Sequence, residues 1–248
     1  MYLIIDTATN LAAVVDPVDP AAIQAAAARH GATIVAICTT HSHWDHHGGN
    51  LQLLKECGTI RECYGGRGDG VDGCTVELDD ASTFAVGETA FTVLFTPCHT
   101  PGHVCYVADG RHVFTGDTLF VSGCGNFNNG TAAQMMAAFD KIMALPDATQ
   151  VWVGHEYTAK NCQFACYAEP ENEDAAKRLA WAQSVTSVHK GGTGTVPSTI
   201  ADEKSCNPFA RIDSSSKIME FCGNCTDRSE RMRLVRKGKD DWGKGLRK

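Results

Sequence analysis

Hydrophobic and polar positions follow two different spacings along the first two thirds of the chain. Apolar, β-branched runs predict strands at residues 2–5, 12–16, 34–40, 60–64, 83–86, 90–95, 104–108, 111–115 and 150–153. Between these runs, Pro20 opens an Ala-rich helix that Gly31 ends, a short helical pattern covers 49–57, and Thr131 caps a helix that runs to Leu145. Strands that alternate with helices predict a layered domain.

The pattern changes after about residue 160. Strand-like runs stop there, and helical stretches such as 175–188 take over, with a loop rich in Gly, Pro, Ser and Thr at 191–199. We therefore expect an α+β protein with a mixed catalytic domain over 1–160 and a smaller, all-helical domain over 161–248.

The formal net charge of −7 hides an uneven distribution. Residues 228–248 contain nine basic and three acidic side chains, so the rest of the chain is strongly acidic. A basic end can bind nucleic acid, a membrane surface or a small anion, or form a solvated helix, and the acidic body argues against a general nucleic-acid binder. No apolar run approaches the ~20 residues that span a bilayer, and the N-terminus does not resemble a leader. We expect a cytoplasmic monomer without membrane contact.

Twelve cysteines are scattered through the predicted strands and helices. In a chain of this size without a secretion leader, we expect reduced thiols rather than a disulfide framework. Cys222 and Cys225 form a CGNC pair, but no second CxxC pair completes a zinc site. We assign the pair no function.

The strongest chemical signal is the segment THSHWDHHGGN at 40–50. It follows a buried strand, and its short turn keeps four side chains close together, namely His41, His43, Asp45 and His46. Imidazole and carboxylate groups crowded into one turn are costly to desolvate unless they share a cation. The HxHxDH spacing therefore predicts a metal site.

Three later segments each offer one more ligand after a strand-like run: His99 in TPCHTPGH, Asp117 in FTGDTLF and His155 in VWVGHEY. For His103 we favour a supporting hydrogen bond or packing over ligation. Five histidines and two aspartates exceed the needs of one ion, so we predict two divalent ions. One ion would be held by His41, His43 and His99, the other by Asp45, His46 and His155, with Asp117 as the bridge. These ligands suit zinc, iron or manganese, and we expect zinc.

In this order, the four segments resemble those of the metallo-β-lactamase superfamily, and more narrowly those of glyoxalase II, the hydroxyacylglutathione hydrolases. The segments VGHEYT, VPST, NPFAR and MRLVRKGKD extend the likeness over nearly the whole chain. The resemblance implies an αββα sandwich with the metals at one edge, followed by a helical domain that helps to bind glutathione. It also implies hydrolysis of S-(2-hydroxyacyl)glutathione, such as S-D-lactoylglutathione, to glutathione and D-lactate in methylglyoxal detoxification.

The resemblance also implies substrate contacts. Tyr157, Arg236 and Lys239 would contact glutathione, and cations suit its carboxylates. The alternative for the two cations is a pair of solvated charges on a tail. In the loop GCGNFNNGT, Asn126 and Asn128 stand where glyoxalase II enzymes often carry a cation and an aromatic residue. We therefore predict weaker glutathione binding, or a different thiol carrier.

The expected chemistry is attack by a metal-bound hydroxide on the thioester carbonyl, with Asp45 and Asp117 as the catalytic carboxylates that hold the ions. The leaving thiol has a reference pKa of ~8.5, so no general acid is required. Three alternatives stay open: a glutathione-linked persulfide dioxygenase, a hydrolase for another thiol carrier, and a non-catalytic protein of the same fold that binds metal or thiol. The complete ligand set, the GHEY segment and the basic end favour the hydrolase.

Overall fold

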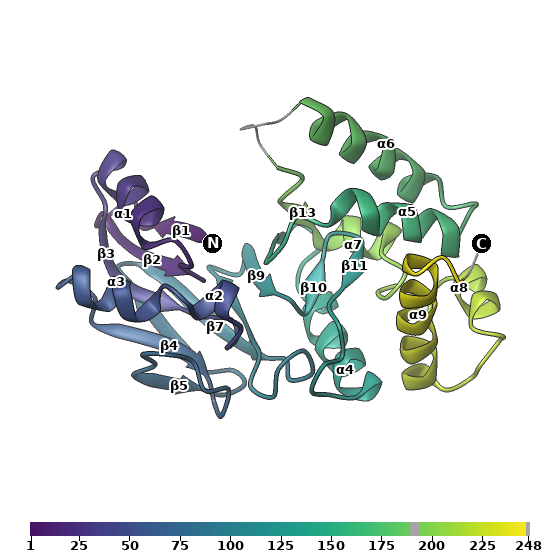
Figure 1. Ribbon diagram of the computed structural model, residues 1–248, viewed down its shortest axis with the longest axis horizontal. Helices are drawn as coiled ribbons and strands as arrows, with labels where there is room; N and C mark the ends of the chain where they lie inside the picture. Colours follow the sequence, from purple (N-terminus) through teal and green to yellow (C-terminus); the bar gives the residue numbers. More distant parts are fainter. Residues whose placement is uncertain (189–193, 247–248) are drawn as a thin grey trace.

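The computed structural model describes residues 1–188 and 194–246, and two β-sheets form its centre (Figure 1). The first sheet has its five strands in chain order: β1 (Tyr2–Ile5), β2 (Leu11–Val15), β3 (Thr33–Cys38), β4 (Glu62–Gly66) and β5 (Val76–Leu78). β1 is antiparallel to β2, and the other neighbours run parallel. Parallel neighbours need crossovers: α1 (Pro20–Arg29) lies between β2 and β3, α3 (Asn50–Glu56) lies between β3 and β4, and a loop over 67–75 connects β4 to β5.

The second sheet has six strands in the order β13-β12-β9-β8-β7-β6. Their bounds are β6 (Thr83–Val86), β7 (Thr89–Phe95), β8 (Val104–Ala108), β9 (His112–Gly116), β12 (Gln150–Val153) and β13 (Ser198–Thr199). The consecutive strands β6 to β9 form an antiparallel meander, and α4 (Ala132–Met143) lies in the connection to β12, which runs parallel to β9. A small hairpin, β10 (Leu119–Phe120) with β11 (Gly123–Cys124), follows β9.

Side chains that alternate along the strands create the layers. On β2, Ala13 and Val15 face the second sheet, whereas Val14 faces α1 and α3. On β8, Tyr106 faces the first sheet, whereas Cys105 joins the cluster that includes α4 and the C-terminal helices. The resulting order of helix, sheet, sheet, helix confirms the predicted αββα sandwich.

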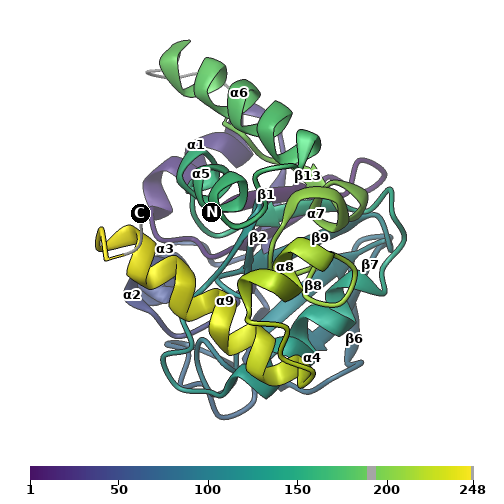
Figure 2. The same cartoon turned by 90° about the vertical axis from the view of Figure 1, so that its right-hand side faces the viewer.

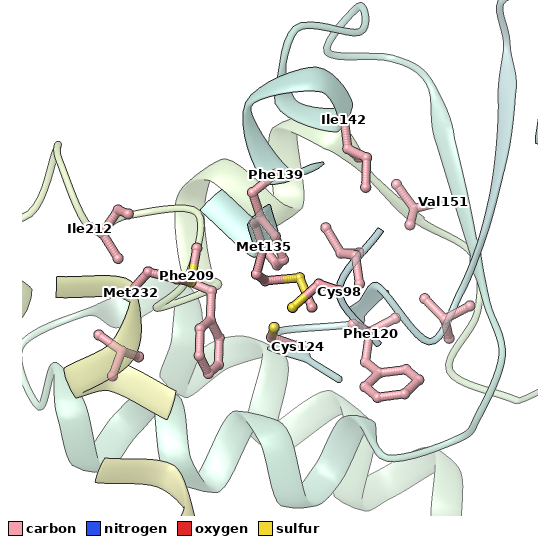
Figure 3. Close-up of a cluster of buried hydrophobic side chains, with 14 of the residues drawn as sticks. Cys98, Phe120, Cys124, Met135, Phe139, Ile142, Val151, Phe209, Ile212 and Met232 are labelled. Atoms are coloured by element: carbon pink, nitrogen blue, oxygen red, sulfur yellow. The ribbon is translucent and has the colours of Figure 1, made fainter. Parts of the chain in front are cut away.

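In the described part of the chain, five helices follow β12: α5 (Thr158–Ala168), α6 (Glu173–Val188), α7 (Ile200–Cys206), α8 (Ser216–Phe221) and α9 (Arg228–Gly243). They gather over one side of the sandwich, as Figure 2 shows. Figure 3 shows their junction with it, where Phe209 and Met232 pack near Met135, Phe139 and Cys124. The C-terminal helices therefore share a core with the second sheet.

Strand structure does not stop after residue 160, which corrects the sequence prediction. Ser198 and Thr199 form β13, which pairs with Val151 and Gln150 of β12. The predicted loop 191–199 thus ends in a strand, and its residues 191–193 lie outside the described part. A buried hydrogen bond of 2.6 Å from the Ser198 hydroxyl to Glu203 holds this strand in place. The pairing depends on a partner about fifty residues away, so local periodicity could not reveal it.

Two further expectations concern the whole chain. All twelve cysteines are free thiols, as the sequence predicts. Among the described residues, no helix combines the length and apolar character needed to cross a membrane.

Candidate metal centre

The seven predicted ligands lie on loops at the ends of strands. The first four follow β3 and extend into the one-turn helix α2 (Trp44–His47), and the others follow β7, β9 and β12. The backbone N–H of Val104 donates to the carbonyl of Thr40 over 2.9 Å, which joins the two sheets at this edge. The structure therefore brings all seven side chains to one end of the sandwich.

Three histidines form the first ligand set. His43 Nδ1 lies 2.9 Å from His41 Nε2 and 3.1 Å from His99 Nε2. His41 and His99 are buried, and His43 is half-buried. Ring nitrogens this close repel one another when their lone pairs point at one another, and a shared cation relieves that repulsion.

Asp45, His46 and His155 form the second ligand set. His155 Nε2 lies 3.1 Å from His46 Nε2 and 3.2 Å from Asp45 Oδ2. Asp117 stands between the two sets, because its Oδ2 is 3.5 Å from both His99 Nε2 and His155 Nε2. Its other oxygen, Oδ1, is 3.4 Å from His46 Nε2. One carboxylate thus faces both sets.

Asp16, directly after β2, orients two of these histidines. Its Oδ2 lies 2.9 Å from His46 Nδ1 and accepts from the Thr40 hydroxyl over 2.8 Å. That hydroxyl lies 3.1 Å from His41 Nδ1. Because the hydroxyl donates to Asp16, it accepts from His41 Nδ1–H. In the neutral form of each ring, Nδ1 carries the proton and a bare Nε2 points into the site.

Asp16 and His46 also shift each other's pKa. Burial alone would raise the pKa of Asp16 and lower the pKa of His46. Their mutual attraction outweighs burial, so the pKa of Asp16 is lowered and the pKa of His46 is raised. Asp117 and Asp45 add to the rise at His46. The carboxylates around this ring therefore favour a positive charge at its position.

The remaining electrostatics also fit a cation. Asp117 Oδ1 is buried and has no hydrogen-bond partner among the described residues. Burial raises the pKa of Asp117 to about 7, and it lowers the pKa of His99 to about 4 and that of His41 well below its usual range. Neutral rings beside a desolvated carboxylate are a donor set that a divalent cation stabilises. The cluster thus fits divalent metal ions.

His103 lies behind the ligands. Its ring is fully buried and stacks on His41 with 5.0 Å between the ring centroids. Its Nδ1 lies 2.9 Å from the Thr96 hydroxyl and 3.1 Å from the Thr118 hydroxyl, and its Nε2 accepts from the backbone N–H of Asp117 over 3.2 Å. Both ring nitrogens are therefore engaged in support of the ligand loops, the role that the sequence favours.

Asp69 is not a predicted ligand, but its side chain makes hydrogen bonds to two of the loops that carry ligands. Its side chain is only 7% exposed, and it lies between β4 and β5 in the chain. Its Oδ2 accepts from the backbone N–H of Ser42 over 2.6 Å, and its Oδ1 accepts from that of Gly102 over 2.7 Å. Ser42 separates His41 from His43, and Gly102 lies in the loop of His99. Asp69 therefore fixes the spacing between these loops.

A pocket of about 400 Å³ opens beside His99 and Asp117. The hairpin, the loop after it, α5 and α9 supply its other lining residues: Phe120, Cys124, Gly125, Asn126, Tyr157, Lys160, Asn161, Arg236 and Lys239. Four of the five predicted substrate contacts thus line this pocket, and we call it the substrate pocket after that prediction. The fifth, Asn128, is exposed and does not line it.

Arg236 and Lys239 are part of this pocket rather than solvated charges on a tail. Arg236 donates to the carbonyl of Cys124 over 2.9 Å and pairs with Asp240. Lys239 Nζ donates to Asn161 Oδ1 over 2.5 Å. Burial, followed by the charge of Arg236, lowers the pKa of Lys239 to about 7. An anion in the pocket would restore the charge of this lysine.

Sequence reasoning missed Asp16, Asp69 and Lys160. Asp16 directly follows the apolar run LAAVV, a position equivalent to that of the later ligands, so the same signal could have revealed it. Lys160 comes three residues after Tyr157, one helical turn on, and could have been placed beside it. Asp69 lies in a turn, RGDGVDG, whose sequence carries no signal of its contacts.

Comparisons with known proteins agree with this geometry. The family model of the metallo-beta-lactamase superfamily matches residues 1–155, and that of the hydroxyacylglutathione hydrolase C-terminus matches residues 156–242. The chain is 45% identical to cytoplasmic hydroxyacylglutathione hydrolase from Arabidopsis thaliana over 97% of this chain and 94% of that protein.

Solved structures show the same fold. ETHE1 from Myxococcus xanthus has a TM-score of 0.65 and 26% identity, over 97% of this chain and 91% of its own. The BLEG-1 B3 metallo-beta-lactamase has a TM-score of 0.61 and 22% identity, over 84% of this chain and 92% of its own, and supports the fold alone. With its two family matches and its relative from Arabidopsis, the chain belongs to the hydroxyacylglutathione hydrolases, or glyoxalase II enzymes, of the metallo-β-lactamase superfamily.

Proposed function

We propose that this chain hydrolyses S-(2-hydroxyacyl)glutathione to glutathione and a 2-hydroxy acid. With S-D-lactoylglutathione the acid would be D-lactate, the product of the second step of methylglyoxal detoxification. The observation that carries this proposal is one pocket that has His99 and Asp117 in its wall together with the cations Arg236 and Lys239. The 45% identity to a hydroxyacylglutathione hydrolase supports the same reaction. That relative is named as a cytoplasmic enzyme, which supports a cytoplasmic location for this chain.

Two divalent ions would occupy the two ligand sets, with Asp117 shared between them. The placement of Asp117 Oδ2 at 3.5 Å from a nitrogen of each set supports this sharing. When bound, such ions lower the pKa of water and polarise a carbonyl oxygen. We expect zinc, although nitrogen and carboxylate ligands also accept iron or manganese.

The chain's own residues would orient the thioester. Arg236 and Lys239 bind a carboxylate of the thiol carrier through charge-assisted hydrogen bonds. Tyr157 stacks on His155 with 5.3 Å between ring centroids, so it forms a wall next to the second ligand set. A carrier held between these groups directs its thioester carbonyl toward Asp117. The leaving thiol, with a reference pKa of ~8.5, departs as a thiolate without a general acid.

The small-molecule thioester is the partner that we propose. The formal charge of −7 disfavours general binding to nucleic acid. We infer a monomer that acts without a nucleic-acid or membrane partner.

Release of free thiol from S-D-lactoylglutathione, measured beside the metal content, tests the proposal. We expect thiol release that chelation abolishes and added zinc restores, with about two ions per chain. Asp117→Ala should lose both metal and activity. Full activity in metal-free protein would refute the metal-dependent reaction.

The same assay separates the alternatives. Oxygen consumption with glutathione persulfide, together with no thiol release from S-D-lactoylglutathione, would indicate a persulfide dioxygenase. Faster turnover of a lactoyl thioester on another carrier would indicate a hydrolase for that carrier. Neither activity in metal-loaded protein would indicate a non-catalytic protein that binds metal or thiol.

A further inference from the structure

The substrate pocket has three cations, and Lys160 is the one without a hydrogen-bond or ion-pair partner among the described residues. Its side chain is exposed on α5, and it takes part in no hydrogen bond or ion pair within that part of the chain. The other two pocket cations are engaged, because Arg236 pairs with Asp240 and Lys239 donates to Asn161. Lys160 therefore carries the positive charge that is free to meet a ligand.

The charges around the pocket are unbalanced. Asp117 is the one carboxylate among the pocket's lining residues, and it belongs to the predicted metal ligands. Arg236 and Lys160 both oppose the protonation of Lys239, whereas Asp240 favours it, so each of these two cations lies close enough to repel Lys239. Positive charges around one pocket repel one another, and an anion bound in the pocket offsets that repulsion.

We propose that Lys160 determines specificity for the thiol carrier by pairing with one of its carboxylates, while Arg236 and Lys239 take another. The pocket thus selects a carrier with two carboxylates over a neutral one. This inference rests on the proposed hydrolase function, and it assigns the carrier's second charge to α5 rather than to α9.

Lys160→Gln removes the charge and keeps a side chain of similar length. For S-D-lactoylglutathione we expect kcat/KM to fall about 3- to 5-fold through KM, with kcat nearly unchanged, because an exposed ion pair contributes modestly. For the diethyl ester of S-D-lactoylglutathione, which lacks both carboxylates, we expect the same variant to match the unsubstituted enzyme. Lys160→Arg should retain kcat/KM for both substrates. Lys55→Gln, at an exposed lysine of α3, serves as the control and should change neither.

Equal losses on the acid and on the ester would show a structural role and overturn the inference. No loss on the acid would also overturn it. Activity of the unsubstituted protein on S-D-lactoylglutathione tests the proposed function separately, so the two failures are distinguishable.

Discussion

Gly154 lies so close to two predicted ligands that it leaves no room for a side chain. A Cβ at this position would lie 2.4 Å from Asp117 Oδ1 and 2.9 Å from His46 Cε1. We expect Gly154→Ala to displace both groups and to lower kcat/KM by about 10-fold or more, with a parallel loss of bound metal. Elemental analysis and thiol release measure the two effects.

Gly58 provides the matched control for this substitution. A Cβ on Gly58 meets no atom within 4 Å, so Gly58→Ala should keep both metal and activity. Full metal content in Gly154→Ala would contradict the predicted roles of Asp117 and His46.

Asp117 makes the metal-free protein sensitive to pH. Burial raises its pKa to about 7 in the folded chain, whereas an unfolded chain has an ordinary value of about 4. The folded state therefore binds the Asp117 proton more tightly than the unfolded state does. The contribution of this proton to the free energy of unfolding is complete below pH about 4 and is lost as the pH rises through about 7. The upper limit of this effect is roughly 4 kcal/mol.

Asp117→Asn tests this dependence because an amide does not ionise. In chelated protein we expect the variant to unfold at a higher temperature than the unsubstituted chain at pH 8, with a smaller difference at pH 5. Scanning calorimetry across this range measures the difference, and a gap that stays constant with pH would contradict the prediction. With metal present the order should reverse, since the amide is a poorer bridge.

The candidate ligands were predictable from single residues because they lie in four short segments that each follow an apolar run. Asp69 was not, because its hydrogen bonds reach Ser42 and Gly102, which lie 27 and 33 residues away. The prediction of weak glutathione binding rested on Asn126 and Asn128 alone. Lys160 lines the same pocket from another element, so the loop sequence could not describe the full charge of the site.

At the scale of elements, length decides what the sequence predicts. The strand at 104–108 is a continuous apolar run of five residues, the helix after Thr131 has a capping box, and both form as predicted. β10, β11 and β13 have two residues each, so their patterns carry no period. They form because partner strands and buried contacts hold them.

The loop between β4 and β5 yields a prediction at this scale. Asp69→Ala removes both acceptors that hold the two ligand loops, whereas Asp69→Asn keeps one carbonyl oxygen. We expect metal affinity of the first ligand set to fall about 10-fold or more in the alanine variant and less in the asparagine variant, because outer contacts orient ligands. Titration against a chromophoric chelator measures this affinity.

Asp72, in the same loop, supplies the control because its side chain is exposed. Asp72→Asn should bind metal like the unsubstituted chain. Unchanged affinity in Asp69→Ala would show that the loops keep their spacing without the carboxylate.

At the scale of the whole molecule, the two predicted domains are not separate in their packing. Phe164 of α5, Met232 of α9 and Phe209, between α7 and α8, share one buried cluster with Leu119 and Met135. The substrate pocket also combines His99 and Asp117 with residues of α5 and α9. The sequence predicted a change of composition near residue 160, but a change of composition does not reveal whether two segments bury a common surface.

Shared burial predicts that the chain unfolds as one unit. Glu203 of α7 is fully buried and accepts from the backbone N–H of Ser122 over 2.9 Å and from the Asn207 side chain over 2.8 Å. Loss of the C-terminal helices would therefore expose both the apolar cluster and these polar groups. We expect one calorimetric transition in metal-free protein, with calorimetric and van't Hoff enthalpies nearly equal. A fragment that ends at residue 160 should aggregate. Two resolved transitions, or a soluble fragment that still binds metal, would show instead that the sandwich is stable without the helices that complete its pocket.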